Sequence, residues 1–278
     1  MKTWLVTGCS SGIGTAIART ALECGDNVVV TARSTDKVAE IVRKYPETAC
    51  AMALDVTDRS SMTAAVAAAK ARFGQIDVLV NNAGHGYGAK IEEGQEDEIQ
   101  ELFQTNFFGP LQLIRMVLPE MRARRSGAIV NISSISAVRG VIGAGYYAAA
   151  KAALELATDS LGKEVAPFGI KVMIVEPGAF RTRFYDTSFK SASRQIDYSG
   201  GAAVTGPVED VSKLRNTLQQ GDPEKAGKCI VEAIGLDHPP KRLLMGSDAF
   251  RIVSVELVNR LREVLEEQDL SRTTDFTD

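Results

Sequence analysis

Tyr147 and Lys151 lie four residues apart in a stretch whose composition is typical of a helix. Residues at this spacing project from the same face of a helix, one turn apart. A tyrosine hydroxyl has an ordinary pKa of about 10, so it needs help to give or take a proton near neutral pH. A neighbouring ammonium group stabilises the phenolate and lowers that pKa. The pair therefore indicates acid–base chemistry, although this spacing alone also arises often by chance.

Tyr146 is the adjacent candidate for the same role. At the same spacing it would pair with Ala150, which carries no charge. Tyr147 is therefore the predicted acid–base residue.

A glycine-rich segment, TGCSSGIG at residues 7–14, follows the first apolar run and precedes a helical pattern. Glycine is needed where a turn is tight, where the backbone approaches a pyrophosphate, and where a helix packs closely on a strand. The N-terminus of the following helix offers free N–H groups and a positive dipole to phosphates. This placement predicts a dinucleotide-binding turn, and a generic glycine-rich turn is the alternative.

The second apolar run ends at Ala32 and Arg33. An acidic residue at this position holds the ribose 2′-hydroxyl of NAD, whereas an arginine accommodates the 2′-phosphate of NADP. A guanidinium binds phosphate bidentately, and no carboxylate stands at the strand end to repel that phosphate. Asp36 is close, but an aspartate in the first turn of a helix more often serves as a cap. We expect NADP(H) to be favoured, with NAD(H) as the alternative and a plain surface role for Arg33 as the competing interpretation.

Short apolar runs rich in β-branched residues alternate with longer helical patterns along the chain. The runs cover residues 4–7, 27–32, 49–54, 78–81, 128–132, 171–176 and 242–245, and the helical patterns cover residues 13–23, 35–45, 60–73, 96–124, 147–166 and 223–234. Runs this short read as buried parallel strands. Regular alternation of strand and helix predicts βαβ units. The expected fold is α/β: a Rossmann-like, doubly wound, parallel seven-stranded sheet with helices on both faces, in a single domain.

Two places depart from this regular order. Pro110 lies inside the pattern at residues 96–124, where it should break or kink the helix. The stretch from Thr182 to about Asp222 is long for a connection, and such an insert is usually a lid or a binding loop. We expect residues 1–182 to form the cofactor-binding and catalytic core, residues 183–222 a substrate-binding loop, and residues 223–268 the last strand and C-terminal helices. The final residues, 271–278, should be frayed.

Composition excludes several classes of function. The net charge of −3, from 32 basic and 35 acidic residues, gives no electrostatic footprint for nucleic acid or an anionic membrane. The 4 cysteines and 2 histidines have no metal-ligand spacing, so we expect no metal and reduced thiols. Neither a signal peptide nor a membrane-spanning run is recognisable, which predicts a cytoplasmic location.

Several motifs, in register along the chain, resemble the short-chain dehydrogenase/reductase family. They are TGCSSGIG at residues 7–14, Asn81-Asn82-Ala83-Gly84, Asn106, Ser133-Ser134, Tyr147-xxx-Lys151 and Pro177-Gly178. The resemblance spans about residues 3–182, roughly two-thirds of the chain. It implies an oxidoreductase that moves a hydride between a nicotinamide cofactor and a carbonyl or alcohol substrate.

The resemblance also implies catalytic roles. Tyr147 would be the general acid or base, and Lys151 would lower its pKa, helped by the nicotinamide charge, and hold the nicotinamide ribose. Ser134 would hydrogen-bond the substrate oxygen, with Ser133 as the alternative hydroxyl. Asn106 would hold a water molecule that links Lys151 to solvent.

A larger set of residues is expected to hold the cofactor. It comprises Gly8, Ser10, Ser11, Gly12, Ile13, Gly14, Arg33, Asp55, Val56, Asn82, Ala83, Gly84, Tyr147, Lys151, Pro177, Gly178 and Thr182. By resemblance, Asp55 and Val56 match adenine contacts, and residues 82–84 line the adenine-ribose side and stabilise the sheet. Pro177, Gly178 and Thr182 would seat the nicotinamide carboxamide.

Two segments should close over the nicotinamide end, namely residues 138–146 and the insert after Thr182. The expected substrate residues are Ser134, Ile142, Tyr147, Phe184 and Tyr185, with Val141, Phe189 and Tyr198 in the same segments and His85 and Tyr87 at the border. This wall is apolar and aromatic, and Arg181, Arg183 and Lys190 are the nearest cations. A medium or bulky apolar ketone, aldehyde or alcohol is therefore the predicted substrate, and the alternative is that the aromatic residues only pack the loop.

A C-terminal segment resembles the branch of the family that contains 17β-hydroxysteroid and retinol dehydrogenases and bacterial carbonyl reductases. This segment is Arg242-Leu243-Leu244-Met245-Gly246-Ser247-Asp248-Ala249. By resemblance, the helices at residues 96–124 and 147–166 would pair in a homodimer or homotetramer. Two other functions compete with a carbonyl reductase. They are an NAD(H)-dependent alcohol dehydrogenase of the same family and a regulator that senses NADP(H) without turnover, although such regulators typically lose the tyrosine, lysine or serine that this chain keeps.

Overall fold

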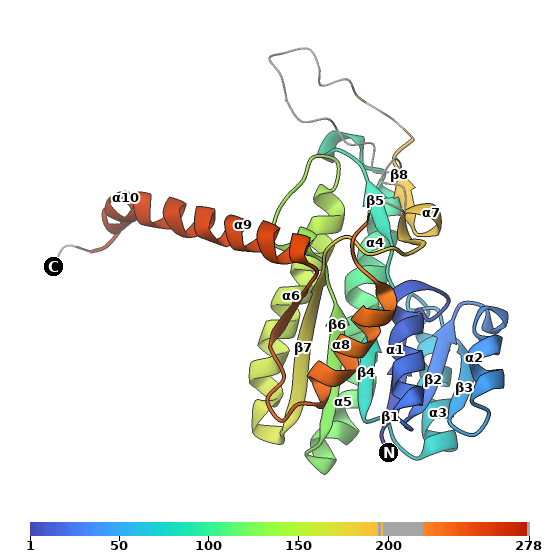
Figure 1. Ribbon diagram of the computed structural model, residues 1–278. Coiled ribbons are helices and arrows are strands. Elements are labelled where there is room, and N and C mark those ends of the chain that lie inside the picture. Colours follow the sequence, from blue (N-terminus) through green and yellow to red (C-terminus); the bar gives the residue numbers. More distant parts are fainter. Residues whose placement is uncertain (194–195, 197–218, 277–278) are drawn as a thin grey trace.

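The computed structural model describes residues 1–193, 196 and 219–276. Within these residues, seven strands form one parallel sheet in the order β3-β2-β1-β4-β6-β7-β9 (Figure 1). The strands are β1 (Thr3–Val6), β2 (Asn27–Ala32), β3 (Ala49–Ala53), β4 (Val78–Asn81), β6 (Gly127–Ile132), β7 (Ile170–Pro177) and β9 (Arg242–Met245). The predicted Rossmann-like, doubly wound sheet is confirmed, and each predicted strand lies within one residue of its expected bounds.

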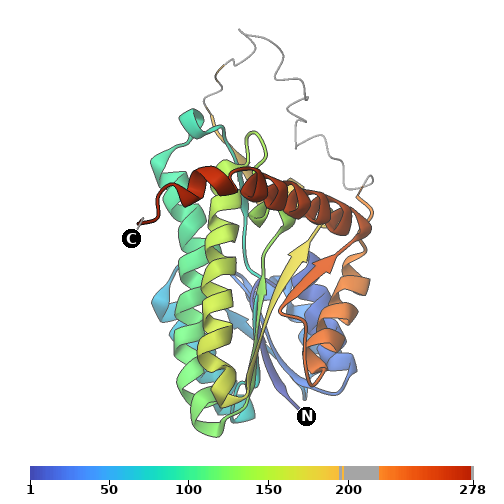
Figure 2. The same cartoon turned by 90° about the vertical axis from the view of Figure 1, so that its left-hand side faces the viewer.

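Helices cover both faces of the sheet. On one face, α1 (Gly12–Glu23) packs against α8 (Pro223–Gly235). On the other face lie α3 (Arg59–Phe73), α5 (Gly109–Arg124) and α6 (Gly145–Val165). Figure 2 shows the sheet between these two helical layers.

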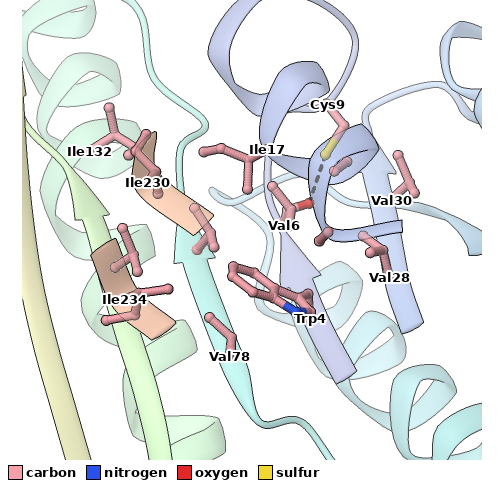
Figure 3. Packing of buried hydrophobic residues seen from close by; sticks show 14 of the residues in the cluster. Trp4, Val6, Cys9, Ile17, Val28, Val30, Val78, Ile132, Ile230 and Ile234 are labelled. Carbon is pink, nitrogen blue, oxygen red and sulfur yellow. Dashed lines mark hydrogen bonds between the residues drawn. The ribbon is translucent and has the colours of Figure 1, made fainter. Parts of the chain in front are cut away.

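Two hydrophobic cores form because successive side chains of a strand point to opposite faces of the sheet. Trp4 and Val6 of β1 pack on the side of α1 and α8, together with Ile17 and Ile230 (Figure 3). Leu5, between them in sequence, packs in the second core with residues of α3 and α5. All three strand residues are almost fully buried, which explains why the strands are apolar throughout.

The order of the strands reverses between β1 and β4, which are direct neighbours in the sheet. In open parallel sheets, ligands bind outside the carboxyl ends of the strands at such a reversal. The glycine-rich segment follows β1, and the Asn81–Gly84 motif begins at the end of β4. The topology therefore brings these two motifs together.

The helix expected at residues 96–124 is three consecutive segments. They are α4 (Glu96–Phe103), a π-helical turn (Gln104–Phe108) and α5, whose first turn contains Pro110. Proline has no N–H to donate to the carbonyl four residues earlier, which here is that of Asn106. The predicted irregularity is therefore confirmed, and it takes the form of a π turn that contains Asn106.

Other elements differ from the prediction. The helix expected at residues 35–45 is a 3₁₀ turn (Thr35–Lys37) followed by α2 (Ala39–Lys44), because Val38 between them has φ −120° and ψ 0°. A small parallel pair, β5 (Gly86–Gly88) with β8 (Phe189–Ser191), was not expected. A short helix, α7 (Phe184–Thr187), precedes β8. The expectation of a frayed end from residue 271 was wrong at its start, since Ser271 and Arg272 end helix α10 (Gln268–Arg272).

The long C-terminal helix α9 (Ser247–Glu266) is present as predicted and leads into α10. In the described part of the chain, no helix has the length and apolar character required to cross a membrane.

Candidate active site

The glycine-rich turn lies between β1 and α1, at the carboxyl edge of the sheet. Gly8 and Gly12 have φ angles of +72° and +65°, which favour glycine. A Cβ atom on Gly8 would lie 2.9 Å from the Cα of Ala83, and one on Gly12 would lie 3.1 Å from the Cγ2 of Thr182. Ser11 precedes α1 and makes no side-chain capping bond. The turn therefore offers backbone and the N-terminus of a 12-residue helix, which suits a pyrophosphate.

The remaining residues of the turn differ in exposure. Ser10 is exposed, Ile13 is partly buried and packs on the core, and Gly14 is buried. A Cβ atom on Gly14 would lie 2.3 Å from the Nδ2 of Asn82 and 2.5 Å from the carbonyl oxygen of Gly8. This position has no room for a side chain.

Asn82 braces the turn from the neighbouring strand. Its Nδ2 donates to the carbonyl oxygens of Thr7 at 2.9 Å and Gly8 at 3.0 Å. The Thr7 hydroxyl in turn accepts from the backbone N–H groups of Asn82 and Ala83, both at 2.9 Å. The side chain of Asn82 thus binds protein backbone and stabilises the turn. Thr7 is a positioning residue that sequence reasoning did not single out, although it stands in the glycine motif.

Arg33 lies at the end of β2, one strand away from the glycine turn. Its side chain is exposed, whereas Ala32 before it is buried. Asp36 lies in the 3₁₀ turn that follows, where its carboxylate accepts a hydrogen bond from the Ser34 hydroxyl at 3.5 Å. The structure therefore places a cation at this strand end and directs the carboxylate of Asp36 to the hydroxyl of Ser34.

Asp55 and Val56 follow β3. The carboxylate of Asp55 accepts hydrogen bonds from the backbone N–H and the hydroxyl of Thr57, at 2.9 and 2.7 Å. Val56 is buried, and a Cβ atom on Gly109 would lie 2.4 Å from its carbonyl oxygen. In this structure Asp55 orders the loop after β3, while Val56 fixes that loop against the start of α5.

Asn106 is fully buried in the π turn. Its Oδ1 accepts from the backbone N–H of His85 at 3.0 Å, and its Nδ2 donates to the carbonyl oxygen of His85 at 2.8 Å. A Cβ atom on Gly84 would lie 2.9 Å from the same Oδ1 and 3.5 Å from the Nζ of Lys151. Asn106 from the π turn and Lys151 from α6 therefore both lie beside the position that a side chain of Gly84 would occupy, and the amide of Asn106 fixes the segment after β4.

Tyr147 and Lys151 lie on one face of α6, as expected. The Nζ of Lys151 is 5.8 Å from the centre of the Tyr147 ring and donates to the carbonyl oxygen of Ile132 at 2.8 Å. Lys151 is buried, and burial lowers its pKa to about 8, while the negative charge of Glu155 acts in the opposite direction.

Burial raises the pKa of the Tyr147 hydroxyl above its ordinary value, and a side-chain hydrogen bond with Ser134 lowers it in part. Desolvation of Tyr147 outweighs the other contributions, and the expectation that Lys151 lowers this pKa stays a prediction. Tyr147 therefore holds its proton at neutral pH, which is the form that can donate to a carbonyl oxygen.

The two serines after β6 have separate partners. The hydroxyl of buried Ser133 donates to the Oε1 of Glu155 at 2.7 Å, which directs it away from Tyr147. Ser134 is only partly buried; its Oγ accepts from the backbone N–H of Ser136 at 3.1 Å and bonds Tyr147. Of the two hydroxyls, Ser134 is the one beside Tyr147.

The loop after β7 is held by a residue that sequence reasoning did not assign to the site. Asp248, at the start of α9, accepts the backbone N–H of Ala179 at 2.7 Å. A Cβ atom on Gly178 would lie 2.4 Å from the carboxylate of Asp248, so only glycine fits there. Asp248 is 69 residues from Ala179, and only its place in the Arg242–Ala249 segment hinted at its importance. Through this bond, α9 fixes the Pro177-Gly178 turn.

An aromatic cluster faces Tyr147 from the segment after Thr182. The ring of Phe184 lies 6.0 Å from that of Tyr147 and 5.4 Å from that of Tyr185. Phe189 completes the cluster at 6.3 Å from Phe184 and 5.6 Å from Tyr185. Ring distances of this size are typical of favourable aromatic pairs. Of the apolar wall predicted from the sequence, Phe184 therefore lies beside Tyr147, and Tyr185 and Phe189 pack on Phe184.

The other expected border residues are distributed differently. Ile142 is 52% exposed, so it lies at the rim. The ring of Tyr87 is buried in a small core against which Tyr146 and Tyr147 pack, and its hydroxyl accepts from the N–H of Gln95 at 3.1 Å. The amine of Lys190 is bound by Glu98 at 2.8 Å and Glu101 at 2.7 Å. Tyr198 lies outside the described residues.

The hydrogen bonding of His85 and Tyr146 shows their place relative to the site. The Nε2 of His85 is buried and has no hydrogen-bond partner within the described part of the chain. The Tyr146 hydroxyl donates to the carbonyl oxygen of Ile91 at 2.6 Å, which removes it from competition with Tyr147. The described residues contain no group of three or more histidine, cysteine, aspartate or glutamate side chains able to hold a metal ion.

Comparison with known proteins agrees with this geometry. Residues 2–192 match the family model described as short chain dehydrogenase. A 3-ketodihydrosphingosine reductase from Bacteroides thetaiotaomicron is 37% identical over 251 residues, which covers 87% of each chain. A crystal structure of a short-chain dehydrogenase from Streptomyces avermitilis superposes with a TM-score of 0.90 at 43% identity and covers 99% of this chain and 98% of that one. The closed form of a serine dehydrogenase complexed with NADP⁺ has a TM-score of 0.74 at 26% identity, covering 87% and 94%.

Proposed function

This chain belongs to the short-chain dehydrogenase family, and from that premise we propose that it is an NADP(H)-dependent enzyme that interconverts an apolar ketone or aldehyde and the corresponding alcohol. Its oxidoreductase class follows from the family. The observation that carries the finer proposal is the surroundings of Tyr147, where Lys151 lies beneath the ring and Phe184 faces it.

The residues present fit a nicotinamide dinucleotide. Gly8, Gly12 and Gly14 leave no side chain in the turn before α1, and a Cβ atom on Gly12 would occupy the space beside Thr182. The turn would hold the pyrophosphate, and the Pro177-Gly178 turn with Thr182 would hold the nicotinamide end. When bound, the cofactor supplies or accepts the hydride.

The chain's own residues handle the proton. Tyr147, protonated at neutral pH, donates its hydroxyl proton to the substrate oxygen during reduction and takes it back during oxidation. Ser134 donates a hydrogen bond to the same oxygen and holds it near the tyrosine. Lys151, fixed by the carbonyl oxygen of Ile132, places an ammonium group beside the ring that stabilises charge on the phenolate. Asn106 holds the backbone of His85 and so keeps Gly84 close to the lysine.

The preference for NADP(H) is supported by Arg33 at the exposed end of β2 and by the NADP⁺ complex of the structurally similar serine dehydrogenase. The absence of a carboxylate at Ala32 agrees with this choice. We assign residues 183–193 to the substrate side of the site; the rest of the expected loop, at residues 194–195 and 197–218, lies outside the described residues.

The preference for an apolar substrate is supported by the aromatic cluster and by the pairing of Lys190 with two glutamates. A cation already bound by two carboxylates offers little to an anionic substrate. The relative from Bacteroides thetaiotaomicron is named for a ketone substrate, which agrees with a carbonyl reductase.

A screen of kcat/KM along a series of methyl ketones of increasing length, with NADPH and with NADH, tests the proposal. Each buried methylene contributes about 0.8 kcal/mol, so kcat/KM should rise several-fold per added carbon until the pocket is full. A flat series, or a preference for a phosphorylated ketose, contradicts the apolar site. Equal use of both cofactors supports the NAD(H) alternative, and NADPH binding without turnover on any carbonyl supports the regulator. A homodimer or homotetramer through α4–α5 and α6, and a cytoplasmic location, stay predictions.

A further inference from the structure

Helix α9 begins on the body of the protein and then leaves it. Ala249 and Val253 in its first two turns are buried, whereas every residue from Leu257 to Phe276 is exposed. Figure 1 shows the helix projecting away from the sheet and carrying the C-terminus with it, and Figure 2 shows the same helix crossing in front of the body. Isolated helices are marginal in water, and most helices are stabilised by packing an apolar face.

The projecting helix has such an apolar face. Six large side chains form it, spaced at one side of the helix: Phe250 (67% exposed), Leu257 (54%), Val258 (56%), Leu261 (59%), Val264 (69%) and Leu265 (60%). We call this set the α9 stripe. A shallow groove runs along Val258, Leu261 and Leu265. Monomeric proteins rarely leave a continuous apolar surface of this kind in water, so the stripe marks an interaction site.

The charges beside the stripe show which partner fits. One edge carries Arg251 near the start of the helix and Glu266 at its end, while the other edge carries Glu256 and Arg260. Suppose two copies of α9 run antiparallel with Leu257 of each opposite Leu261 of the other. Arg251 of one copy then lies level with Glu266 of the second copy on the same edge, whereas Glu256 and Arg260 on the other edge already pair within each helix. In a parallel pair, Arg251 of one copy and Glu266 of the other would lie about 22 Å apart along the helix axis.

We propose that the α9 stripe is an interface with a second copy of this chain, in which the two α9 helices pair antiparallel. An anionic membrane surface fits less well, since residues 263–278 carry six acidic side chains and one arginine. This interface is separate from α5 and α6, where the family resemblance places subunit contacts.

The pairing would also reach the active site. The first turns of α9 hold the loop after β7 through Asp248, and Arg260 donates to the carbonyl oxygen of Val138 in the loop before α6. Fixing α9 against a second copy therefore fixes the anchors of both loops.

The mass of the full chain in solution, measured by sedimentation velocity over a range of concentrations, tests the proposal. Leu257→Glu with Leu261→Glu should reduce the assembly by one dimerisation step, with at least a 100-fold weaker association. Asn259→Glu adds one negative charge to the exposed opposite side of the helix and should leave the mass unchanged. Circular dichroism and thermal unfolding establish that each variant is folded.

A charge exchange tests the antiparallel arrangement itself. Arg251→Glu should weaken association, and adding Glu266→Arg should restore it. The two residues are about 22 Å apart along one helix, so they can only compensate between copies. Several outcomes overturn the proposal: a monomeric wild type at all concentrations, an unchanged mass for the double glutamate variant, absence of rescue, or binding of the monomer to phosphatidylcholine vesicles through the stripe.

Discussion

At the scale of single residues, the candidate site contains pairs of similar side chains, and their hydrogen bonds determine which member of each pair is available to a substrate. Two tyrosines and two serines compete for catalytic positions. Tyr146 is bound to Ile91 and Ser133 is bound to Glu155, which leaves Tyr147 and Ser134 beside each other. Burial raises the pKa of Tyr147 and so keeps the proton on its hydroxyl at neutral pH.

The role of Tyr147 gives the first prediction. Tyr147→Phe keeps the ring and its packing on Phe184 but removes the proton donor. We expect the fold and NADPH binding to be retained and turnover to fall about 10²–10⁴-fold, the usual contribution of general acid–base catalysis. Tyr146→Phe is the matched control, since it removes only the bond to Ile91, and its turnover should stay near that of the wild type. Near-normal turnover of Tyr147→Phe would remove Tyr147 from the mechanism.

A second prediction concerns the choice of cofactor. Arg33→Asp should weaken the binding of NADPH far more than that of NADH, because only NADPH carries the 2′-phosphate. A hydrogen bond to a charged group contributes ~1.5–3 kcal/mol, or roughly 10–150-fold in Kd. Arg43→Asp makes the same change at an exposed position of α2 and should alter neither Kd. Titration of both nucleotides by fluorescence measures the effect, and equal losses for the two cofactors would show that Arg33 does not contact the phosphate.

At the scale of elements, turns and irregular segments position the chemistry that the strands and helices support. The glycine turn after β1 and the Asn81–Gly84 segment after β4 are joined by the side chains of Thr7 and Asn82. The π turn before α5 performs a similar task for Asn106. These local structures are where small changes should have the largest effects on binding.

Gly14 provides the test at this scale. Alanine is normally favoured over glycine in a helix by about 1 kcal/mol, but a Cβ atom here would lie 2.3 Å from the Nδ2 of Asn82. We expect Gly14→Ala to lower the free energy of unfolding by ~1–3 kcal/mol and to weaken NADPH binding, because the amide that braces the turn must move. Gly162→Ala in α6 is the control, since its Cβ atom would meet the Cβ of Val172 at an ordinary 3.8 Å. Thermal unfolding with and without NADPH compares them, and equal stability of the two variants would contradict the bracing role.

At the scale of the whole molecule, the sheet edge gathers charges from three elements. The charged residues are Glu155 on α6, Glu176 on β7 and Arg242 on β9. The Nε of Arg242 lies 3.8 Å from the Oε1 of Glu176. Burial and the charge of Glu155 raise the pKa of Glu176 to about 7. Ionising both Glu155 and Glu176 is unfavourable, because the two buried carboxylates repel each other and share one partly exposed arginine.

This cluster predicts a dependence of stability on pH. Because the pKa of Glu176 is higher in the folded state than in the unfolded chain, the folded state binds more protons between about pH 4.5 and 7. The contribution of Glu176 to stability is therefore present at low pH and lost as the pH rises through about 7. The loss is on the order of 3 kcal/mol at most, from 1.36 kcal/mol per pKa unit.

Urea unfolding at pH 5 and pH 8 measures this effect. Glu176→Gln removes the ionisation, so its stability should fall less than that of the wild type between these two values. Glu164→Gln, at an exposed position of the same helix as Glu155, should keep the wild-type difference. An unchanged difference in Glu176→Gln would assign the pH dependence to other groups.

The order and type of the main elements, and the identity of the chemical groups, could be predicted from the sequence. Strands and helices have different periods of apolar residues, which are visible locally, so all seven strands of the large sheet were predicted within one residue. The glycine turn, Tyr147 and Lys151 were also visible, because each role requires a residue type at a fixed spacing.

The contacts between distant segments could not be predicted from the sequence and are visible only in the folded chain. Residues far apart in sequence meet where β5 pairs with β8 and where Asp248 accepts the N–H of Ala179. The burial of Tyr87 also depends on distant segments. The local spacing of apolar residues does not encode such contacts. The pKa of Tyr147 likewise depends on how much water the fold excludes, which spacing to Lys151 does not reveal. The exposure of the α9 stripe could not be predicted either. An amphipathic pattern predicts an apolar face, but only the packed fold shows whether other parts of the chain cover that face.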